Sequence, residues 1–233
     1  MGKTTKTGST TLVRTALAEQ AYEILKERIL DQRLVPGMRL NIDALTRELS
    51  VSSSPLREAL ARLEAERLVV AEIYSGYTVA PEPTPSYLHD LIDFRIMLEG
   101  HCALIGAPKK IPQILNEMRA AMKQMKTTQK LGMRYKQYKK FIAADTRFHQ
   151  AIVASAGNQA ASDSYRGMNG ILLQARLYLH RSSGEERVTE VTHEHERIVR
   201  AFEEGDGVAA QTALREHLEG GKRRLLSEEY SKL

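Results

Sequence analysis

Three alternating prolines, Pro81, Pro83 and Pro85, interrupt the chain and constrain its fold more than any other feature. Each proline fixes its own φ and lacks an N–H donor, so this stretch is extended and stiff rather than helix or central strand. We therefore predict two domains, at 12–80 and 86–229, joined by a linker at 81–85. A polar, flexible tail is expected at 1–11.

The composition is that of a folded protein without disulfides. Hydrophobic residues make up 42% and charged residues 27% of the 233 residues, which is ordinary for a globular chain. Cys102 is the single cysteine, which excludes a disulfide framework and a cysteine-based zinc finger and fits a reducing cytoplasm. The polar start resembles no signal peptide, and no apolar run approaches the ~20 residues that cross a bilayer. We expect a cytoplasmic protein without membrane contact.

The first domain has the pattern of a winged helix-turn-helix, that is, three helices followed by a β-hairpin. Asn41 is a suitable N-cap for the second helix, and the third begins at serines with a proline in its first turn. Apolar spacing at Leu17, Ala21, Ile24, Leu25 and Ile29 supports the first helix. The expected elements lie at 12–33, 42–49, from 52–54 onward, 68–73 and 77–80.

The second domain shows helical periodicity and no strand pattern, so we predict an all-helical bundle of six or seven helices. The fold class is therefore mainly α. Gly157, Gly184 and Gly205 each lie near an expected helix end. The expected helices lie at 86–105, 111–127, 131–156, 160–181, 185–204 and 206–229.

The third helix of the first domain would enter the major groove of DNA. Ser52, Ser53 and Ser54 place hydroxyls and helix N–H groups where phosphates are bound, and Arg57 lies one turn on, within reach of a phosphate or a guanine. Gly76 would let the wing approach the DNA backbone or minor groove. The alternative is a helical pair that only packs. The formal charge of +5 does not decide between them, because residues 1–80 are close to balanced.

Three predicted helices of the second domain each turn a histidine toward the core. Asp145 and His149 are four residues apart and share one face, while His195 and His217 have apolar neighbours at helical spacing. Buried polar groups need partners, and this set suits a metal ion. Each histidine could instead be a hydrogen-bonded core residue, and spacing alone leaves the choice open. His193 lies about 200° around the helix from His195 and should face solvent.

The first domain resembles the GntR family of bacterial regulators through PGMRL (36–40), SVSSSPLREALARLEAERLV (50–69) and SGYTVAP (75–81). The resemblance implies that the third helix and the wing contact operator DNA. The family usually has an arginine where this chain has Ser53, and that arginine commonly contacts a guanine. We therefore expect a different operator sequence, with base contacts leaning on Arg57 and Ser54.

The second domain is similar to the C-terminal domain of the FadR-type branch, the FCD domain, through DTRFHQAIVASAGN (145–158) and EHERIVRAFEEGD (194–206). The resemblance implies a metal site at Asp145, His149, His195 and His217, with zinc or nickel as the metal. It also implies that Arg95, in FRIMLEG (94–100), pairs with an effector acid. A salt bridge from Arg95 to Glu99 is the alternative.

These expectations combine into a ligand-responsive transcription regulator, not an enzyme. It would act as a homodimeric repressor on double-stranded operator DNA and bind a small carboxylic acid at its metal. One alternative is a metal-dependent hydrolase with an accessory DNA-binding domain, although the sequence has no HExxH motif and no nucleophile elbow. The other is the same regulator with a purely structural metal.

Overall fold

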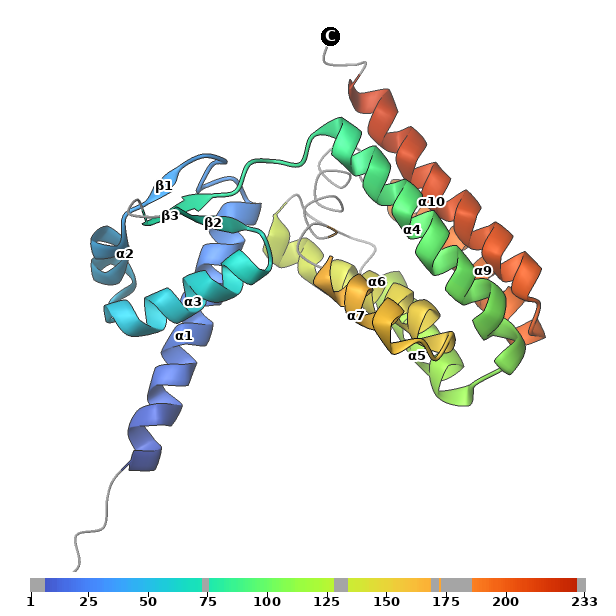
Figure 1. Cartoon of the computed structure of the whole chain (residues 1–233), viewed down its shortest axis with the longest axis horizontal. Coiled ribbons are helices and arrows are strands. Elements are labelled where there is room, and N and C mark those ends of the chain that lie inside the picture. Colours follow the sequence, from blue (N-terminus) through green and yellow to red (C-terminus); the bar gives the residue numbers. More distant parts are fainter. Residues whose placement is uncertain (1–6, 73–75, 128–133, 169–171, 173–185, 230–233) are drawn as a thin grey trace, which may run out of the picture. The chain divides into compact units, whose positions relative to one another are not determined.

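The computed structural model describes residues 7–72, 76–127, 134–168, 172 and 186–229. The chain divides into two compact units, Met1–Glu82 and Pro83–Leu233 (Figure 1). The division falls among the prolines at 81–85. The first unit has helices and a small sheet and the second is all helical in its described part, so the predicted mainly α fold class is confirmed. No described helix is both long and apolar enough to cross a membrane.

Helix α1 (Thr7–Leu30) differs from the prediction at both ends. It begins before Leu12, because no proline interrupts the residues ahead of it, so residues 7–11 are helical rather than part of a flexible tail. It ends before Arg33, because Gln32 takes a positive φ of 55° and the Arg33 N–H donates to the carbonyl of Arg28 at 2.8 Å. This left-handed closure is a common helix stop.

Helices α2 (Ile42–Leu49) and α3 (Ser53–Ala65) form where the sequence predicts them. Asn41 caps α2 by accepting a hydrogen bond from the Ala44 N–H at 2.9 Å, as expected. The core that α3 shares with α1 contains Ala21, Leu25, Ile29, Leu56, Leu60 and Leu63. Ile24, which has the same helical spacing, is 41% exposed and is not part of this core.

The wing is a three-stranded antiparallel sheet with the order β1-β3-β2. Strands β2 (Val69–Glu72) and β3 (Gly76–Val79) form the predicted hairpin, with Val70 opposite Thr78. Strand β1 (Arg39–Leu40) was not predicted, because two residues are too few to show an alternating pattern. Of the predicted turn Tyr74-Ser75-Gly76, Gly76 begins β3, while residues 73–75 lie outside the described residues. Three helices and this sheet make a winged helix-turn-helix.

The second unit is built from helices whose described bounds follow the predicted ones closely, with one exception. The predicted helix 160–181 ends at Gly167, and residues 169–171 and 173–185 lie outside the described part. A short 3-10 turn, η1 (Ala107–Lys109), follows the first helix. The helices are α4 (Pro85–Gly106), α5 (Pro112–Thr127), α6 (Tyr135–Ser155), α7 (Gln159–Gly167), α9 (Glu186–Glu204) and α10 (Gly207–Glu229).

Helix α4 packs against both α6 and α10, while α9 packs against α5 and α10 (Figure 1). The approach is close at Gly106, where a Cβ would overlap the Ser155 side chain of α6, and at Gly207, where it would overlap the Leu104 carbonyl. Glycine is therefore required at these two crossings. The core between α4, α6, α9 and α10 is where the predicted ligand residues lie.

Candidate metal centre and nucleic-acid interface

Four predicted ligands come together from three helices. Asp145 and His149 lie on α6, His195 on α9 and His217 on α10, and each residue is at most 7% exposed. Their apolar neighbours Phe148 and Ile198 are buried as expected. His193 is exposed, also as expected. The chain therefore places three imidazoles and a carboxylate in one apolar core.

The distances between these side chains match those between ligands of one metal ion. The Nε2 atoms of His149 and His195 are 3.4 Å apart, and Asp145 Oδ1 lies 3.8 Å and 3.5 Å from them. One nitrogen of each histidine, His217 included, lies within 4.8 Å of the others. A tetrahedron with metal–nitrogen bonds of about 2.0–2.1 Å has edges of about 3.4 Å. The donor set thus fits a divalent cation.

His149 is oriented by a buried carboxylate. Its Nδ1 lies 2.6 Å from Oε2 of Glu99, a residue with no exposed surface. Burial raises the pKa of Glu99, but Arg95 and His149 outweigh it and lower this pKa to about 2. The ionised carboxylate only accepts hydrogen bonds, so Nδ1 of His149 carries the proton. Burial also lowers the pKa of His149. The neutral ring therefore presents the lone pair of Nε2 toward Asp145 and His195.

His217 has the same arrangement on another helix. Its Nδ1 lies 2.6 Å from Oε2 of Glu194 on α9. The Glu194 side chain is 13% exposed, so this pair is nearer to solvent than the pair of His149 and Glu99. A carboxylate that accepts the Nδ1 proton leaves Nε2 as the nitrogen available to a metal.

Arg95 makes the salt bridge to Glu99 and also retains a donor. Its Nε donates to Glu99 Oε1 at 2.6 Å. Its Nη2 is buried and has no hydrogen-bond partner within the part of the chain that the structure describes. Burial lowers the pKa of Arg95, but Glu99, Tyr165 and Asp145 outweigh this effect and raise it. The guanidinium is therefore charged, and it interacts electrostatically with a predicted metal ligand.

Glu99 and Glu194 were not identified as site residues from the sequence. A signal for Glu99 exists, because the buried face of α4 runs from Leu88 through Ile92 to Cys102 and includes Arg95 and Glu99. Two charges at positions where the periodicity requires apolar residues indicate a function. Glu194 has no such signal, because its partner lies 23 positions away on the next helix.

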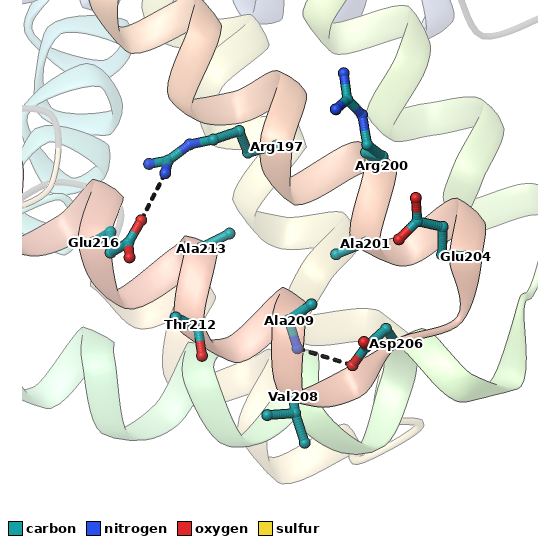
Figure 2. Close-up of a pocket in the computed structure, with 10 residues that line it drawn as sticks. All are labelled: Arg197, Arg200, Ala201, Glu204, Asp206, Val208, Ala209, Thr212, Ala213 and Glu216. Atoms are coloured by element: carbon teal, nitrogen blue, oxygen red, sulfur yellow. Dashed lines mark hydrogen bonds and ion pairs between the residues drawn. The ribbon is translucent and has the colours of Figure 1, made fainter.

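Figure 2 shows an open pocket between α9 and α10 that none of the predicted site residues lines. Arg197 pairs there with Glu216 at 2.6 Å, and Asp206 accepts a hydrogen bond from the Ala209 N–H at the start of α10. These charged groups join the two helices or cap one of them. The buried cluster, not this pocket, is the candidate ligand site.

The predicted DNA-contacting residues are all exposed. Ser52 is the N-cap residue of α3, yet its side chain makes no capping hydrogen bond. Ser53 and Ser54 form the first turn, and Arg57 follows one turn later. Gly76 starts β3 with a φ of 89° and has open space around it. The apolar face of α3 is packed, as the alternative of a helical pair that only packs requires. Its polar face is exposed and accessible to another molecule.

A winged helix-turn-helix joined to an all-helical domain with a buried polar cluster defines a two-domain DNA-binding regulator. Residues 17–79 match the family described as "Bacterial regulatory proteins, gntR family", and residues 90–220 match the "FCD domain". The chain belongs to the GntR family of regulators that carry an FCD domain, an architecture consistent with the FadR-type branch. The predicted regulator is confirmed, and the domains are not those of a hydrolase.

Two relatives that match this chain over most of their own length are named as transcriptional repressors. The "Probable D-xylose utilization operon transcriptional repressor" of Paenarthrobacter nicotinovorans is 28% identical over 207 residues, 89% of this chain and 88% of that one. The "HTH-type transcriptional repressor GlaR" of Escherichia coli (strain K12) is 25% identical over 199 residues, 84% of this chain and 90% of that one.

Two solved structures share the fold. "E. coli McbR/YncC" superimposes with a TM-score of 0.70 at 20% identity, covering 91% of this chain and 98% of that one. A "putative transcriptional regulator GntR from Rhodococcus sp. RHA1" also has a TM-score of 0.70, at 21% identity, covering 90% and 97%. These likenesses concern the fold alone.

Proposed function

We propose that this protein is a repressor that binds operator DNA as a cytoplasmic homodimer and responds to a small carboxylic acid through a divalent metal, zinc or nickel. The two curated relatives described above are named as repressors, which supports the sign of regulation. The first unit binds the DNA, and the second senses the acid and pairs the two chains. The linker at 81–85 transmits the response.

The observation that carries the proposal is the buried donor set, with separations of 3.4 to 3.8 Å between Asp145, His149 and His195. Burying several polar groups is costly unless each has a partner, and one cation satisfies them together. His217, held by Glu194, completes the set. A bound divalent cation would supply positive charge toward an anion, and mixed nitrogen and oxygen ligands suit Zn²⁺ or Ni²⁺.

Arg95 supports the choice of a carboxylic acid as effector. Its buried Nη2 is a donor that lacks a partner among the described residues, and guanidinium groups bind carboxylates strongly. An acid held between this arginine and the cation would contact α4 together with the helices of the cluster. Acid binding and DNA binding would then be coupled, each changing the affinity of the other by the same factor.

The DNA interface proposed for the first unit uses the exposed start of α3 and the wing. Ser52, Ser53 and Ser54 with the adjacent helix N–H groups would hold a phosphate, and Arg57 would reach a phosphate or a guanine edge. Gly76 would let the backbone of the wing approach the DNA closely. With Ser53 in place of an arginine, the operator preference rests on fewer long side chains.

Metal analysis and ligand-induced stabilisation test the sensor. Elemental analysis of the purified full chain should find one divalent metal per chain, and a screen of small carboxylic acids should raise its melting temperature, because a ligand of the native state stabilises it by mass action. His195→Ala should lose both the metal and the acid-dependent shift. His193→Ala, two residues away but exposed, is the matched control and should behave like the unchanged protein. A His195→Ala protein that keeps metal and acid response would refute the proposal.

A purely structural metal is the second candidate, because the cluster is buried and two of its histidines are already held by carboxylates. The same screen on protein stripped of metal separates the candidates. A structural metal predicts that acid affinity survives removal of the metal wherever the domain stays folded. A sensing metal predicts that acid affinity falls sharply.

A further inference from the structure

Glu99 is a single buried carboxylate whose two oxygen atoms serve two different groups. Oε2 lies 2.6 Å from Nδ1 of His149, and Oε1 accepts the Nε hydrogen of Arg95, also at 2.6 Å. The residue has no exposed surface, so no bulk water can replace either contact. One contact is with a proposed metal ligand, and the other is with the arginine whose Nη2 has no hydrogen-bond partner among the described residues.

We propose that Glu99 is a positioning residue held in common by the metal site and the acid site, so that one carboxylate orients both His149 and Arg95. This inference rests on the proposed function and adds to it. Carboxylates that hold a ligating histidine typically change metal affinity by about 10–100-fold when they are replaced. Here the same replacement must also release the guanidinium.

Replacing Glu99 with glutamine shows why the two roles are linked. An amide has one acceptor oxygen and one NH₂ donor, whereas the carboxylate has two acceptor oxygens. Both partners of Glu99 are donors, Nδ1–H of His149 and Nε–H of Arg95. Whichever way the glutamine side chain turns, its NH₂ group faces one of these donors and that contact is lost. Its oxygen can still accept from the other donor, but without the negative charge of a carboxylate that hydrogen bond is weaker.

Glu194 provides the matched control within the same chain. It holds Nδ1 of His217 at 2.6 Å, the same distance at which Glu99 holds His149. The Nε hydrogen of Arg95, however, goes to Glu99. Glu194→Gln can keep its oxygen on His217, so it should weaken metal binding without changing Arg95.

The experiment compares the full-length Glu99→Gln and Glu194→Gln proteins with the unchanged chain in two assays. Competition with a chelator measures the affinity for Zn²⁺, and titration of protein saturated with Zn²⁺ with acetate, followed by melting temperature, measures the affinity of the acid site. The absorption spectrum of the Co²⁺-loaded proteins reports whether His149 still binds in a tetrahedral site.

Glu99→Gln should lower zinc affinity by about 10–100-fold, alter the Co²⁺ spectrum and lower acetate affinity by about tenfold. Glu194→Gln should lower zinc affinity only and leave acetate affinity within about twofold. The inference is overturned if the two variants behave alike, if Glu99→Gln changes one affinity and not the other, or if the unchanged protein saturated with Zn²⁺ does not bind acetate.

If circular dichroism shows that Glu99→Gln does not fold, Arg95→Lys tests the contact between Glu99 and Arg95 by changing the other residue of the pair. It keeps a positive charge beside Glu99 but lacks the planar donor fork, so zinc affinity should stay within about threefold while acetate affinity falls by about tenfold. A larger loss of zinc affinity, or unchanged acetate binding, overturns the inference. If the unchanged protein binds zinc no better than the His195→Ala variant does, the proposed function itself is refuted.

Discussion

The two units use their cores in opposite ways. In the first unit, called the head below, the residues proposed to contact DNA are all exposed. The core beneath them is apolar, as at Leu56, Leu60 and Leu63. In the helical unit, the residues proposed to bind ligands are themselves core residues, as at Asp145, His149 and His195. The head can therefore change its binding surface without changing its stability, whereas in the helical unit binding and stability are linked.

Leu60→Ala should have the largest effect and should separate the units. Leu60 is fully buried in α3, and truncating such a leucine costs about 2–5 kcal/mol of unfolding free energy. We expect the melting transition of the head to fall and DNA affinity to fall with it, while zinc affinity is unchanged. Chelator competition and thermal unfolding measure the two effects, with the exposed Ala61→Ser as control. Equal loss of zinc affinity would mean that the units unfold as one.

Asp145→Asn should weaken zinc binding by more than about 100-fold, because replacing a residue that only supports a ligand already costs about 10–100-fold. The change is isosteric and removes the one carboxylate among the four proposed ligands. Asp163→Asn, on the exposed face of α7, is the control and should bind zinc normally. If the comparison between the units is right, DNA affinity measured without metal or acid is the same in both variants. Zinc affinity that is unchanged in Asp145→Asn would remove this residue from the site.

Arg57→Ala tests the exposed surface of the head. Loss of this side chain should weaken operator binding by about 1–3 kcal/mol and change the unfolding free energy by less than about 0.5 kcal/mol, because Arg57 is exposed. Fluorescence anisotropy with an operator fragment at two salt concentrations measures the first effect. Glu64→Ala, near the other end of α3, should bind DNA normally. A large loss of stability in Arg57→Ala would show that the residue belongs to the packing of the head.

Two cap substitutions sharpen the same point with the smallest effects. Asn41→Ala removes the hydrogen bond to the Ala44 N–H and should cost about 1 kcal/mol of stability. Ser52→Ala should cost little, because the Ser52 side chain makes no capping bond, yet it should weaken DNA binding. Chemical denaturation and operator titration of both variants provide the measurement. Equal stability losses would show that Ser52 serves the helix and not the DNA.

The sequence predicted elements best where a local rule decides the structure. Asn41 is a strong cap, and α2 begins and ends as expected. Prediction from the sequence failed where tertiary structure decides. Strand β1 exists only because β3 pairs with it. The positive φ of Gln32, which follows the end of α1, is a backbone conformation that no strong sequence signal marks. Ile24 fits the helical spacing of a core residue but is 41% exposed, because burial depends on which neighbours the fold brings to that side of α1.

The candidate site divides in the same way. The four proposed ligands could be named because each lies on an apolar face and because their pattern resembles that of a family. That Glu99 serves His149 and Arg95 together is a property of two helices in space, α4 and α6, and no spacing within either helix reveals it. The pair of Glu194 and His217 likewise requires the crossing of α9 and α10.

The close contact at Gly106 lies at one end of helix α4, so a rigid tilt about this contact would displace the other end of the helix most. Its last turn lies so close to the Ser155 side chain that no Cβ fits between them, while its first residue, Pro85, is the last of the three alternating prolines of the linker. At 1.5 Å per residue the arm from Gly106 to Pro85 is about 31 Å long. Tilting the arm by about 5° displaces Pro85 by about 3 Å. The same rigid tilt would displace Glu99, which is seven residues from Gly106, by only about 1 Å.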